Sequence, residues 1–355
     1  MKIAVFPGDG IGVEVIGEAV KVLNAALGSS YEYELVKGLI GGAAMAACGE
    51  ALPDRTIAIA EEADAILLGG CGLPGDETMS SDVSATGALL KLRKRLNLFA
   101  NYRPVKPHRA LIGASTLKPE IVSDLDLVVV RETSSGLYFG LPRGISALPG
   151  GERAGTNTLT YSESEVERIA RAGFELARRR TGKLTSVDKA NVLESMVLWR
   201  DVVSQVSREY PDVALSHLYV DAAAMELMRD PKQFDVMVTE NLFGDILSDA
   251  AAMLTGSIGM LPSATMTYGR KGLFEPVHGT APDIAGRNVA NPIAAILSAA
   301  MMLRMSFGLE EEAIRIEQAV DRVLDSGLRT QDIFTPEGEL VGTTQMGDAV
   351  VAALV

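Results

Sequence analysis

The sequence is poor in cysteine, histidine and aromatic residues. Its 355 residues include two cysteines, Cys48 and Cys71, and three histidines, and aromatic residues make up 5% of the chain. The two cysteines do not form a CxxC pair. A thiolate zinc site is therefore excluded, and the cysteine usage is typical of a reducing cytosol.

Positive charge and long apolar runs are also scarce. Thirty-three lysines and arginines stand against 46 acidic residues, and the net charge of −13 argues against nucleic acid and anionic membranes as partners. The longest apolar run, near 293–303, is too short to span a bilayer, and the chain start lacks the pattern of a secretory signal. We therefore expect a soluble cytoplasmic protein, in which any anionic ligand is captured by a local cluster of arginines.

Short apolar runs typical of strands alternate with amphipathic segments typical of helices. The strand-like runs are 2–6, 31–36, 64–69, 125–132, 184–188 and 234–240, and the clearest helical patterns are 12–27 and 162–180. This alternation predicts an α/β fold with a largely parallel sheet. The length allows one large domain or two ordinary domains with a sizeable core.

A Gly- and Pro-rich segment, 140–156, interrupts this alternation. Its flanks, SSGLYFG (134–140) and TNTLTYS (156–162), have the composition of short strands. We therefore predict an excursion such as a hairpin arm.

The first strand-like run is followed by PGDGIG (7–12), which invites comparison with the dinucleotide-binding fingerprint GxGxxG. Here Gly8, Gly10 and Gly12 give GxGxG, and Val13 occupies the position of the third glycine of the fingerprint. That glycine allows close packing of helix on strand, so its loss argues against a Rossmann site. A tight turn that opens the helix at 12–27 is the favoured interpretation.

The segment NLFGDILSDAAAML (241–254) carries two aspartates in an otherwise apolar pattern. Asp245 and Asp249 fall one turn apart on one helical face, where like charges destabilise each other unless a positive group lies nearby. One interpretation is a helix start with Asn241 as the N-cap. The other is a divalent cation held between the carboxylates, with further oxygen ligands from elsewhere.

Three other stretches carry polar residues in a similar context: Tyr138 in GLYFG, Lys189 in SVDKANVLE and Asp221 in YVDAAAM. Each alone also fits an ordinary role, as a half-buried strand tyrosine, a surface lysine or a helix-start aspartate. Together with 241–264 and FEPVHGTAPDIAGRNVANP (274–292), these stretches occur in an order that resembles the isocitrate/isopropylmalate dehydrogenase family from end to end.

The resemblance implies a two-domain fold with a mixed, largely parallel sheet flanked by helices and a protruding arm. Domain one would join residues 1–98 to 256–355, and domain two would span 99–255 with the arm, the metal carboxylates and the dimer interface. A homodimer with shared active sites is implied.

The resemblance also implies the chemistry of the site. Asp245 and Asp249 would bind Mg²⁺ or Mn²⁺ together with Asp221 of the partner subunit, since carboxylate oxygens suit these hard cations. Oxidation of a 2-hydroxy acid at C2 needs a base, and protonation after loss of CO₂ needs an acid. Lys189 and Tyr138 match the family residues that fill these places. A lysine acts as a base at neutral pH only where its site favours the neutral amine.

Three arginines match the family residues that hold the substrate carboxylates: Arg93, Arg103 and Arg131. An isolated arginine usually solvates a surface, but Arg131 closes a β run and Arg103 precedes a proline in an apolar stretch. Guanidinium groups bind carboxylates through two parallel hydrogen bonds.

The cofactor implied is NAD. The residues that correspond to the adenosine-binding loop of the family are His278, Gly279, Thr280, Ala281, Asp283, Ile284 and Asn291. The carboxylate of Asp283 can accept hydrogen bonds from ribose hydroxyls but repels a 2′-phosphate, so we expect NAD rather than NADP.

The expected substrate is a 3-substituted malate, most closely 3-isopropylmalate, which such an enzyme converts to 4-methyl-2-oxopentanoate in leucine biosynthesis. Leu89, Leu90 and Val192 of a partner match the apolar residues that receive the isopropyl group, and they supply no cation for the γ-carboxylate of isocitrate. Ala85 stands about where isopropylmalate enzymes usually place a glutamate. D-malate or tartrate decarboxylation is therefore the alternative activity, and a non-catalytic regulatory homologue is the alternative class.

Overall fold

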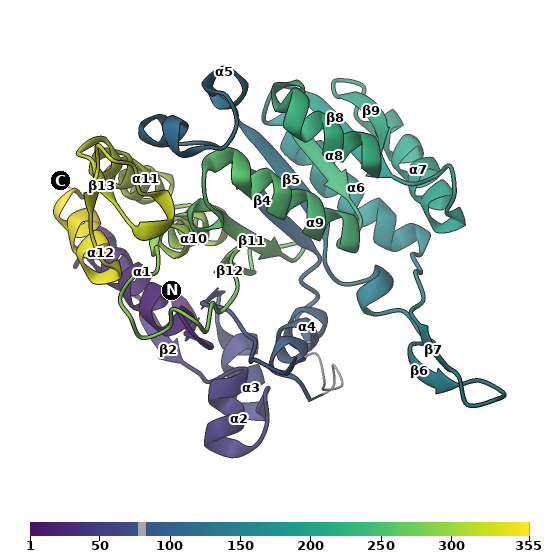
Figure 1. Cartoon of the computed structure of the whole chain (residues 1–355), viewed down its shortest axis with the longest axis horizontal. Helices are drawn as coiled ribbons and strands as arrows, with labels where there is room; N and C mark the ends of the chain where they lie inside the picture. The colour runs from purple at the N-terminus through teal and green to yellow at the C-terminus, as the bar shows by residue number, and fades with distance from the viewer. Residues whose placement is uncertain (77–82, 355) are drawn as a thin grey trace.

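The computed structural model describes residues 1–76 and 83–354, and in these ranges ten strands form one sheet (Figure 1). In spatial order the strands are β2 (Glu34–Lys37), β1 (Lys2–Phe6), β3 (Ala65–Leu68), β12 (Gly272–Pro276), β11 (Pro262–Met266), β4 (Ala100–Val105), β5 (Leu127–Glu132), β10 (Val236–Thr239), β8 (Lys183–Asp188) and β9 (Ala214–Tyr219).

The sheet is parallel on both sides and antiparallel in the middle. Parallel pairs join β2, β1, β3 and β12 on one side and β5, β10, β8 and β9 on the other. The pairs β12–β11, β11–β4 and β4–β5 are antiparallel. The mixed, largely parallel α/β sheet expected from the sequence is confirmed.

Helices pack on both faces of this sheet (Figure 1). Their bounds are α1 (Gly12–Leu27), α2 (Gly42–Cys48), α3 (Asp54–Glu62), α4 (Ala85–Arg95), α5 (Pro119–Val122), α6 (Glu163–Arg178), α7 (Glu194–Val206), α8 (Val220–Arg229), α9 (Asn241–Ala252), α10 (Ile293–Met302), α11 (Glu310–Asp325) and α12 (Thr343–Ala352). Two short strands, β13 (Leu328–Arg329) and β14 (Glu339–Leu340), pair beside α11.

Strand alternation divides the core between the two faces of the sheet. Along β1, Ile3 and Val5 join a cluster with α1 and α10, whereas Ala4 and Phe6 join a cluster with α3 and α4. The first cluster continues across the whole sheet, because alternate residues of β5 and β10 belong to it. All ten residues of α10 are buried, so the long apolar run of the sequence is a central core helix.

The domain boundaries predicted at 98/99 and 255/256 fall between β11 and β4 in the strand order. All strands on one side of this line come from 2–68 and 262–276, and all strands on the other side come from 100–239. The large apolar cluster crosses the same line. The division into two domains stays a prediction. In the part of the chain described here, no helix is long and apolar enough to cross a membrane.

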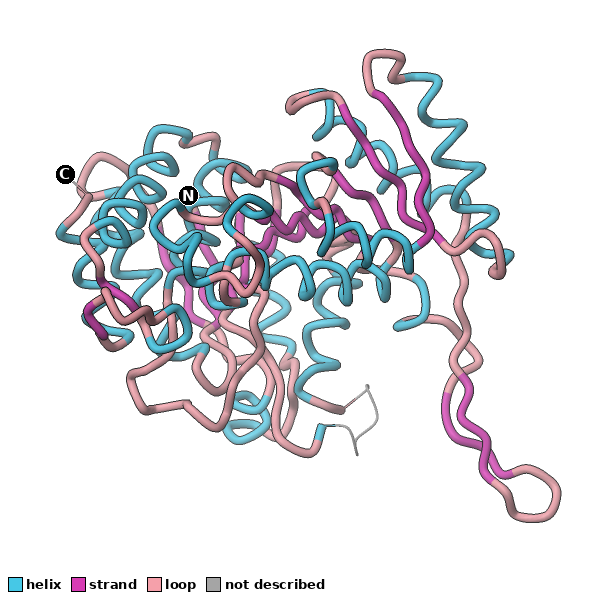
Figure 2. The backbone as a smooth tube through the Cα atoms, turned by 45° about the horizontal axis from the view of Figure 1, so that its top comes forward, coloured by secondary structure: helices cyan, strands magenta, loops and turns pink. Residues whose placement is uncertain are grey.

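The arm is present, but its strands lie elsewhere than predicted. β6 (Gly144–Ala147) and β7 (Arg153–Thr156) pair inside the Gly- and Pro-rich segment and project from the body as a hairpin (Figure 2). The flank 134–140 is not a strand, because it contains a 3-10 turn at Gly136–Tyr138, and most of 156–162 is irregular. Gly136 has φ +80°, which lies outside the strand region, and an added Cβ would lie 2.3 Å from the Tyr161 hydroxyl, so this position requires glycine and cannot continue a strand.

The turn after β1 opens α1 as predicted. Gly8 and Gly10 have positive φ, and α1 begins at Gly12. The Ile11 amide donates to the Thr280 carbonyl at 2.8 Å, so a protein oxygen occupies the start of this helix. A bound pyrophosphate would need that position, which agrees with the absence of the full fingerprint.

Asp9, at the centre of this turn, ties three loops together. Its buried carboxylate accepts hydrogen bonds from the amides of Gly42 (2.9 Å), Ala43 (2.8 Å) and Gly72 (3.0 Å). The first two amides begin α2, and the third lies beyond β3. One side chain therefore fixes how three loop segments meet beside β1.

We predict that Asp9→Asn lowers the free energy of unfolding by about 2 kcal/mol, because one carboxylate oxygen becomes an NH₂ group that faces a buried N–H donor. Urea unfolding followed by circular dichroism measures this change. Asp201→Asn, the same chemical change at an exposed position of α7, is the control and should be neutral. Equal midpoints for the two variants would contradict the role given to Asp9.

Candidate active site

The helix α9 begins directly after β10 and carries both aspartates of the signature. Its N-cap is Glu240, whose side chain accepts a hydrogen bond from the Phe243 amide at 2.6 Å. The interpretation of Asn241 as the N-cap is therefore wrong. Asn241 is instead the first helical residue, and its buried side chain points to Arg131.

Buried arginines from two neighbouring strands face the aspartates of α9. Arg131, at the end of β5, donates through Nη1 to Asp245, and Arg103 of β4 donates to Asp249 at 3.0 Å. Arg103 Nη2 also lies 3.7 Å from Asp245. The like charges of α9 are thus compensated within this chain, and both carboxylates stay partly exposed, at 35% and 51%.

Tyr138 completes this group. Its hydroxyl donates to Asp245 Oδ2 at 2.6 Å, and the Arg131 guanidinium lies 5.7 Å from its ring centre. The 3-10 turn at Gly136–Tyr138 places the ring beside α9. The structure therefore brings Arg103, Arg131, Tyr138, Asp245 and Asp249 together from four separate segments.

The pKa directions follow from this arrangement. Burial would raise the pKa of Asp245, but Arg131, the Tyr138 hydrogen bond and Arg103 hold it below its ordinary value. Burial raises the pKa of Asp249, and Arg103 opposes this shift only in part. Burial and the bond to Asp245 raise the pKa of Tyr138 to about 12, so its hydroxyl keeps its proton at neutral pH. Burial and the nearby Arg131 lower the pKa of Arg103 to about 10.

Arg93, the third predicted arginine, lies on α4 and pairs with Glu275 of β12. The two groups are 2.6 Å apart and both are buried. Glu275 lies in FEPVHG and was not predicted as a site residue, although a glutamate inside an apolar strand is a usable signal. Leu89 and Leu90 lie one turn before Arg93 and are half-buried. Ala85 is fully buried at the start of the same helix.

Lys189 and Asp221 form a second, separate group. Lys189 follows β8, Asp221 lies in the first turn of α8, and their charged atoms are 2.7 Å apart. Val192, three residues after Lys189, is 61% exposed. Within residues 1–76 and 83–354, no three His, Cys, Asp or Glu side chains are grouped as metal ligands, so Asp221 does not join Asp245 and Asp249 in one chain.

The predicted cofactor residues lie on the loop that follows β12. His278 is buried, and its Nδ1–H donates to the Gly279 carbonyl at 2.9 Å. Its Nε2 atom is buried without a partner among the described residues, and burial lowers the pKa of the imidazole. The neutral ring therefore presents an unused acceptor, which fits a ligand that carries an N–H or O–H donor.

The rest of this loop is held by several elements. Thr280 contacts the β1–α1 turn, Ala281 has φ +38°, Ile284 is half-buried and Asp283 is exposed. The Asn291 amide is already occupied, because it donates to Asp332 at 3.0 Å. Glu14 of α1 was not predicted to take part, yet its carboxylate accepts from the loop amides at 286 and 288, at 3.0 and 2.9 Å.

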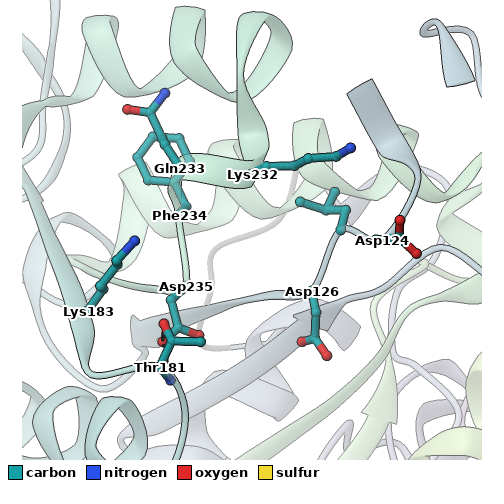
Figure 3. A pocket seen from close by; sticks show the side chains of 9 residues that line it. Asp124, Asp126, Thr181, Lys183, Lys232, Gln233, Phe234 and Asp235 are labelled. Carbon is teal, nitrogen blue, oxygen red and sulfur yellow. Dashed lines mark hydrogen bonds between the residues drawn. The ribbon is translucent and has the colours of Figure 1, made fainter. Parts of the chain in front are cut away.

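A surface hollow elsewhere in the molecule does not belong to this site. It lies before β5, β8 and β10, at the amino ends of these strands, whereas Arg131, Lys189 and Asn241 lie at their carboxyl ends. Figure 3 shows its charged lining, which includes Lys183, Lys232 and Asp235 and no predicted site residue. Ligands of open α/β sheets bind at the carboxyl ends, which agrees with the cluster around α9.

The sequence and the fold of this chain are similar to those of known proteins. The profile of the family described as "Isocitrate/isopropylmalate dehydrogenase" matches residues 2–350. The chain is 57% identical over 358 residues to a 3-isopropylmalate dehydrogenase of Burkholderia lata, with all of both chains covered. It is 58% identical over 354 residues to a 3-isopropylmalate dehydrogenase of Pseudomonas fluorescens, covering 99% of this chain and 98% of the relative. The crystal structure of isocitrate dehydrogenase from Methylococcus capsulatus superposes with a TM-score of 0.90 at 36% identity, covering 99% of each chain.

Proposed function

Because the chain belongs to the isocitrate/isopropylmalate dehydrogenase family, we propose that it oxidises and decarboxylates 3-isopropylmalate with NAD and a divalent cation. The family membership makes it a decarboxylating hydroxy-acid dehydrogenase. The choice of isopropylmalate is supported by relatives of that name at 57–58% identity over nearly the whole chain. The product would be 4-methyl-2-oxopentanoate, a step of leucine biosynthesis.

The observation that carries the proposal is the group on α9. Asp245 and Asp249 offer partly exposed carboxylates one turn apart, and these hard oxygens are the donors that Mg²⁺ or Mn²⁺ prefers. A bound cation would act as a Lewis acid at the C2 oxygen and stabilise the enolate left by decarboxylation. We propose Asp221 of the partner subunit as the third protein ligand.

The side chains of the site would divide the remaining tasks. Arg93, Arg103 and Arg131 would hold the substrate carboxylates. Tyr138 keeps its proton at neutral pH, which is the state that a general acid needs before it protonates the carbon left by CO₂. Lys189, from the partner, would take the proton of the C2 hydroxyl.

NAD would accept the hydride, bound against the loop from His278 to Asn291. The orphaned acceptor of His278 supports a bound group with a donor hydrogen at this point. We propose that the exposed carboxylate of Asp283 accepts from ribose hydroxyls and repels the 2′-phosphate of NADP.

A homodimer with shared sites is part of the proposal. The single chain leaves large apolar side chains exposed on α8, α9 and the arm: Leu141, Ile145, Met225, Met228 and Ile246. Such a surface is expected to be covered in a stable protein. On α9, Ile246 directly follows Asp245, and on α8, Met225 lies one turn after Asp221, which favours a partner that covers both helices and brings the two groups together.

Two alternatives to isopropylmalate oxidation differ from it in the substrate or in the presence of catalysis. D-malate or tartrate decarboxylation uses the same chemistry and is favoured by Ala85 at the position of the usual glutamate. A non-catalytic regulatory homologue would be expected to lack the acid, the base or a metal carboxylate, and this chain retains all of them.

The proposed function is tested by NADH formation with Mn²⁺ across isopropylmalate, D-malate, tartrate and isocitrate, with NADP as the second acceptor. We expect the highest kcat/KM for isopropylmalate, and about tenfold or more preference for NAD over NADP. If kcat/KM is higher for D-malate or tartrate, that acid would replace isopropylmalate as the proposed substrate. Equal use of both cofactors would reject the role of Asp283.

We predict that Asp245→Asn lowers metal-dependent kcat/KM by about 100-fold or more, because a neutral amide replaces an anionic metal ligand. A titration of activity with Mn²⁺ should also show weaker half-saturation. Asp201→Asn is the matched control. Normal activity of Asp245→Asn at low Mn²⁺ would reduce the aspartate pair to a structural feature of α9.

Shared sites predict complementation between inactive chains. A mixture of Lys189→Ala and Asp245→Asn chains, exchanged to form heterodimers, should regain up to about half of the wild-type activity per heterodimer. One of its two sites then combines an intact Asp245 with an intact Lys189, while the other carries both defects. Confirmed heterodimers that stay inactive would mean that each subunit builds its own site.

A further inference from the structure

Two of the site arginines are held by buried asparagines. The Asn101 Oδ1 atom accepts from Arg103 Nε at 2.7 Å. The Asn241 Oδ1 atom accepts from Arg131 Nε at 3.1 Å and from Nη2 at 2.7 Å. Both asparagines are at most 1% exposed. The same arrangement therefore occurs at two separate places in the site.

The orientation of each amide is fixed from its other end. Asn101 Nδ2 donates to the Thr265 hydroxyl of β11 at 2.9 Å, and Asn241 Nδ2 donates to the Ser135 carbonyl at 3.0 Å. Because a carbonyl accepts and cannot donate, the oxygen of Asn241 has to face Arg131. The second anchor also ties α9 to the loop that carries Tyr138 three residues later.

A count of donors shows what each arginine has left. A guanidinium has five N–H donors. Arg131 uses three, two on Asn241 and one on Asp245. Arg103 also uses three, one each on Asn101, Ser248 and Asp249. Among the described residues, Arg131 has one N–H group without a hydrogen-bond partner on Nη1 and one on Nη2, the pair of nitrogens that a bidentate carboxylate takes. Both such N–H groups of Arg103 are on Nη2, so Arg103 can give a carboxylate one hydrogen bond in addition to its charge.

Asparagine is suited to this task because it is neutral. It orients the guanidinium without adding a negative charge to those of Asp245 and Asp249, whereas a carboxylate in the same place would form a further ion pair and compete with a bound substrate. Arg93 differs, since its hydrogen-bond partner among the described residues is the buried carboxylate of Glu275 and not an asparagine.

We propose that Asn101 and Asn241 are positioning residues that hold Arg103 and Arg131 for substrate carboxylates without adding further negative charge to the site. Asn241 in addition sets the loop of Tyr138 through Ser135. This inference rests on the proposed function of the two arginines as carboxylate ligands.

The test uses the near-isosteric variants Asn101→Asp and Asn241→Asp in the full-length enzyme, with the exposed Asn24→Asp as the control. We expect the KM for the hydroxy acid to rise by about tenfold or more, because a protein carboxylate now occupies the guanidinium. The KM for NAD should stay within about twofold. A purely structural role would change both constants together or neither.

A second pair of variants leaves both asparagines in place. Thr265→Val removes the hydroxyl that orients Asn101 and should raise the hydroxy-acid KM in the same direction, whereas Thr265→Ser keeps the hydroxyl and should retain the wild-type value. This pair decides the role of Asn101 even where Asn101→Asp fails to fold.

The two levels of the proposal fail in different ways. A wild-type enzyme that turns over none of the four hydroxy acids would remove the proposed function. A wild-type enzyme with normal turnover, in which both aspartate variants and Thr265→Val keep the wild-type KM for the hydroxy acid, would overturn only the positioning roles.

Discussion

The site depends on the compensation of two like charges on one helix face. Asp245 and Asp249 would repel each other one turn apart, and Arg103 and Arg131 would be costly to bury alone. The charges of the two arginines offset the repulsion between the aspartates, and the aspartates offset the cost of burying the arginines. Asp245 contacts both arginines and Tyr138. The opposite pKa shifts of the two aspartates show that this compensation is uneven, and it favours the ionised form of Asp245.

The sheet topology makes this compensation possible. β4 and β5 are antiparallel neighbours at the centre of the sheet, so the start of β4 lies beside the end of β5. In the register of this pair, Asn101 lies opposite Arg131 and Arg103 opposite Val129. α9 then packs over both strands and presents its aspartates to the two arginines. A wholly parallel sheet would not bring these residues together with this register.

Local signals in the sequence predicted the helices and strands, but they did not identify every side-chain contact within the site. The strand at 2–6 and the helix at 12–27 have the predicted bounds, and helical spacing correctly put Asp245 and Asp249 on one face. The mistaken N-cap at Asn241 shows the limit, because asparagine at a helix start fits a cap and an arginine ligand equally well. Glu275 was missed because its partner, Arg93, lies 182 residues away, and only the tertiary fold joins them. The alternation N-x-R in β4 was a usable signal, since residues two apart share a strand face.

The charge balance of the site links its structure to the proposed chemistry. Three arginines lie in or beside the cluster with three carboxylates, namely Arg93, Arg103, Arg131, Asp245, Asp249 and Glu275. With Tyr138 protonated, the group is formally neutral. A divalent cation alone or a dianionic malate alone would leave an excess of two charges in a partly buried site. The two together restore neutrality, which favours their joint binding over the binding of either alone. The charge distribution of the site would change when CO₂ leaves. The hydroxyl of the protonated Tyr138 donates a hydrogen bond to Asp245, so the proton of Tyr138 lies next to a proposed metal ligand.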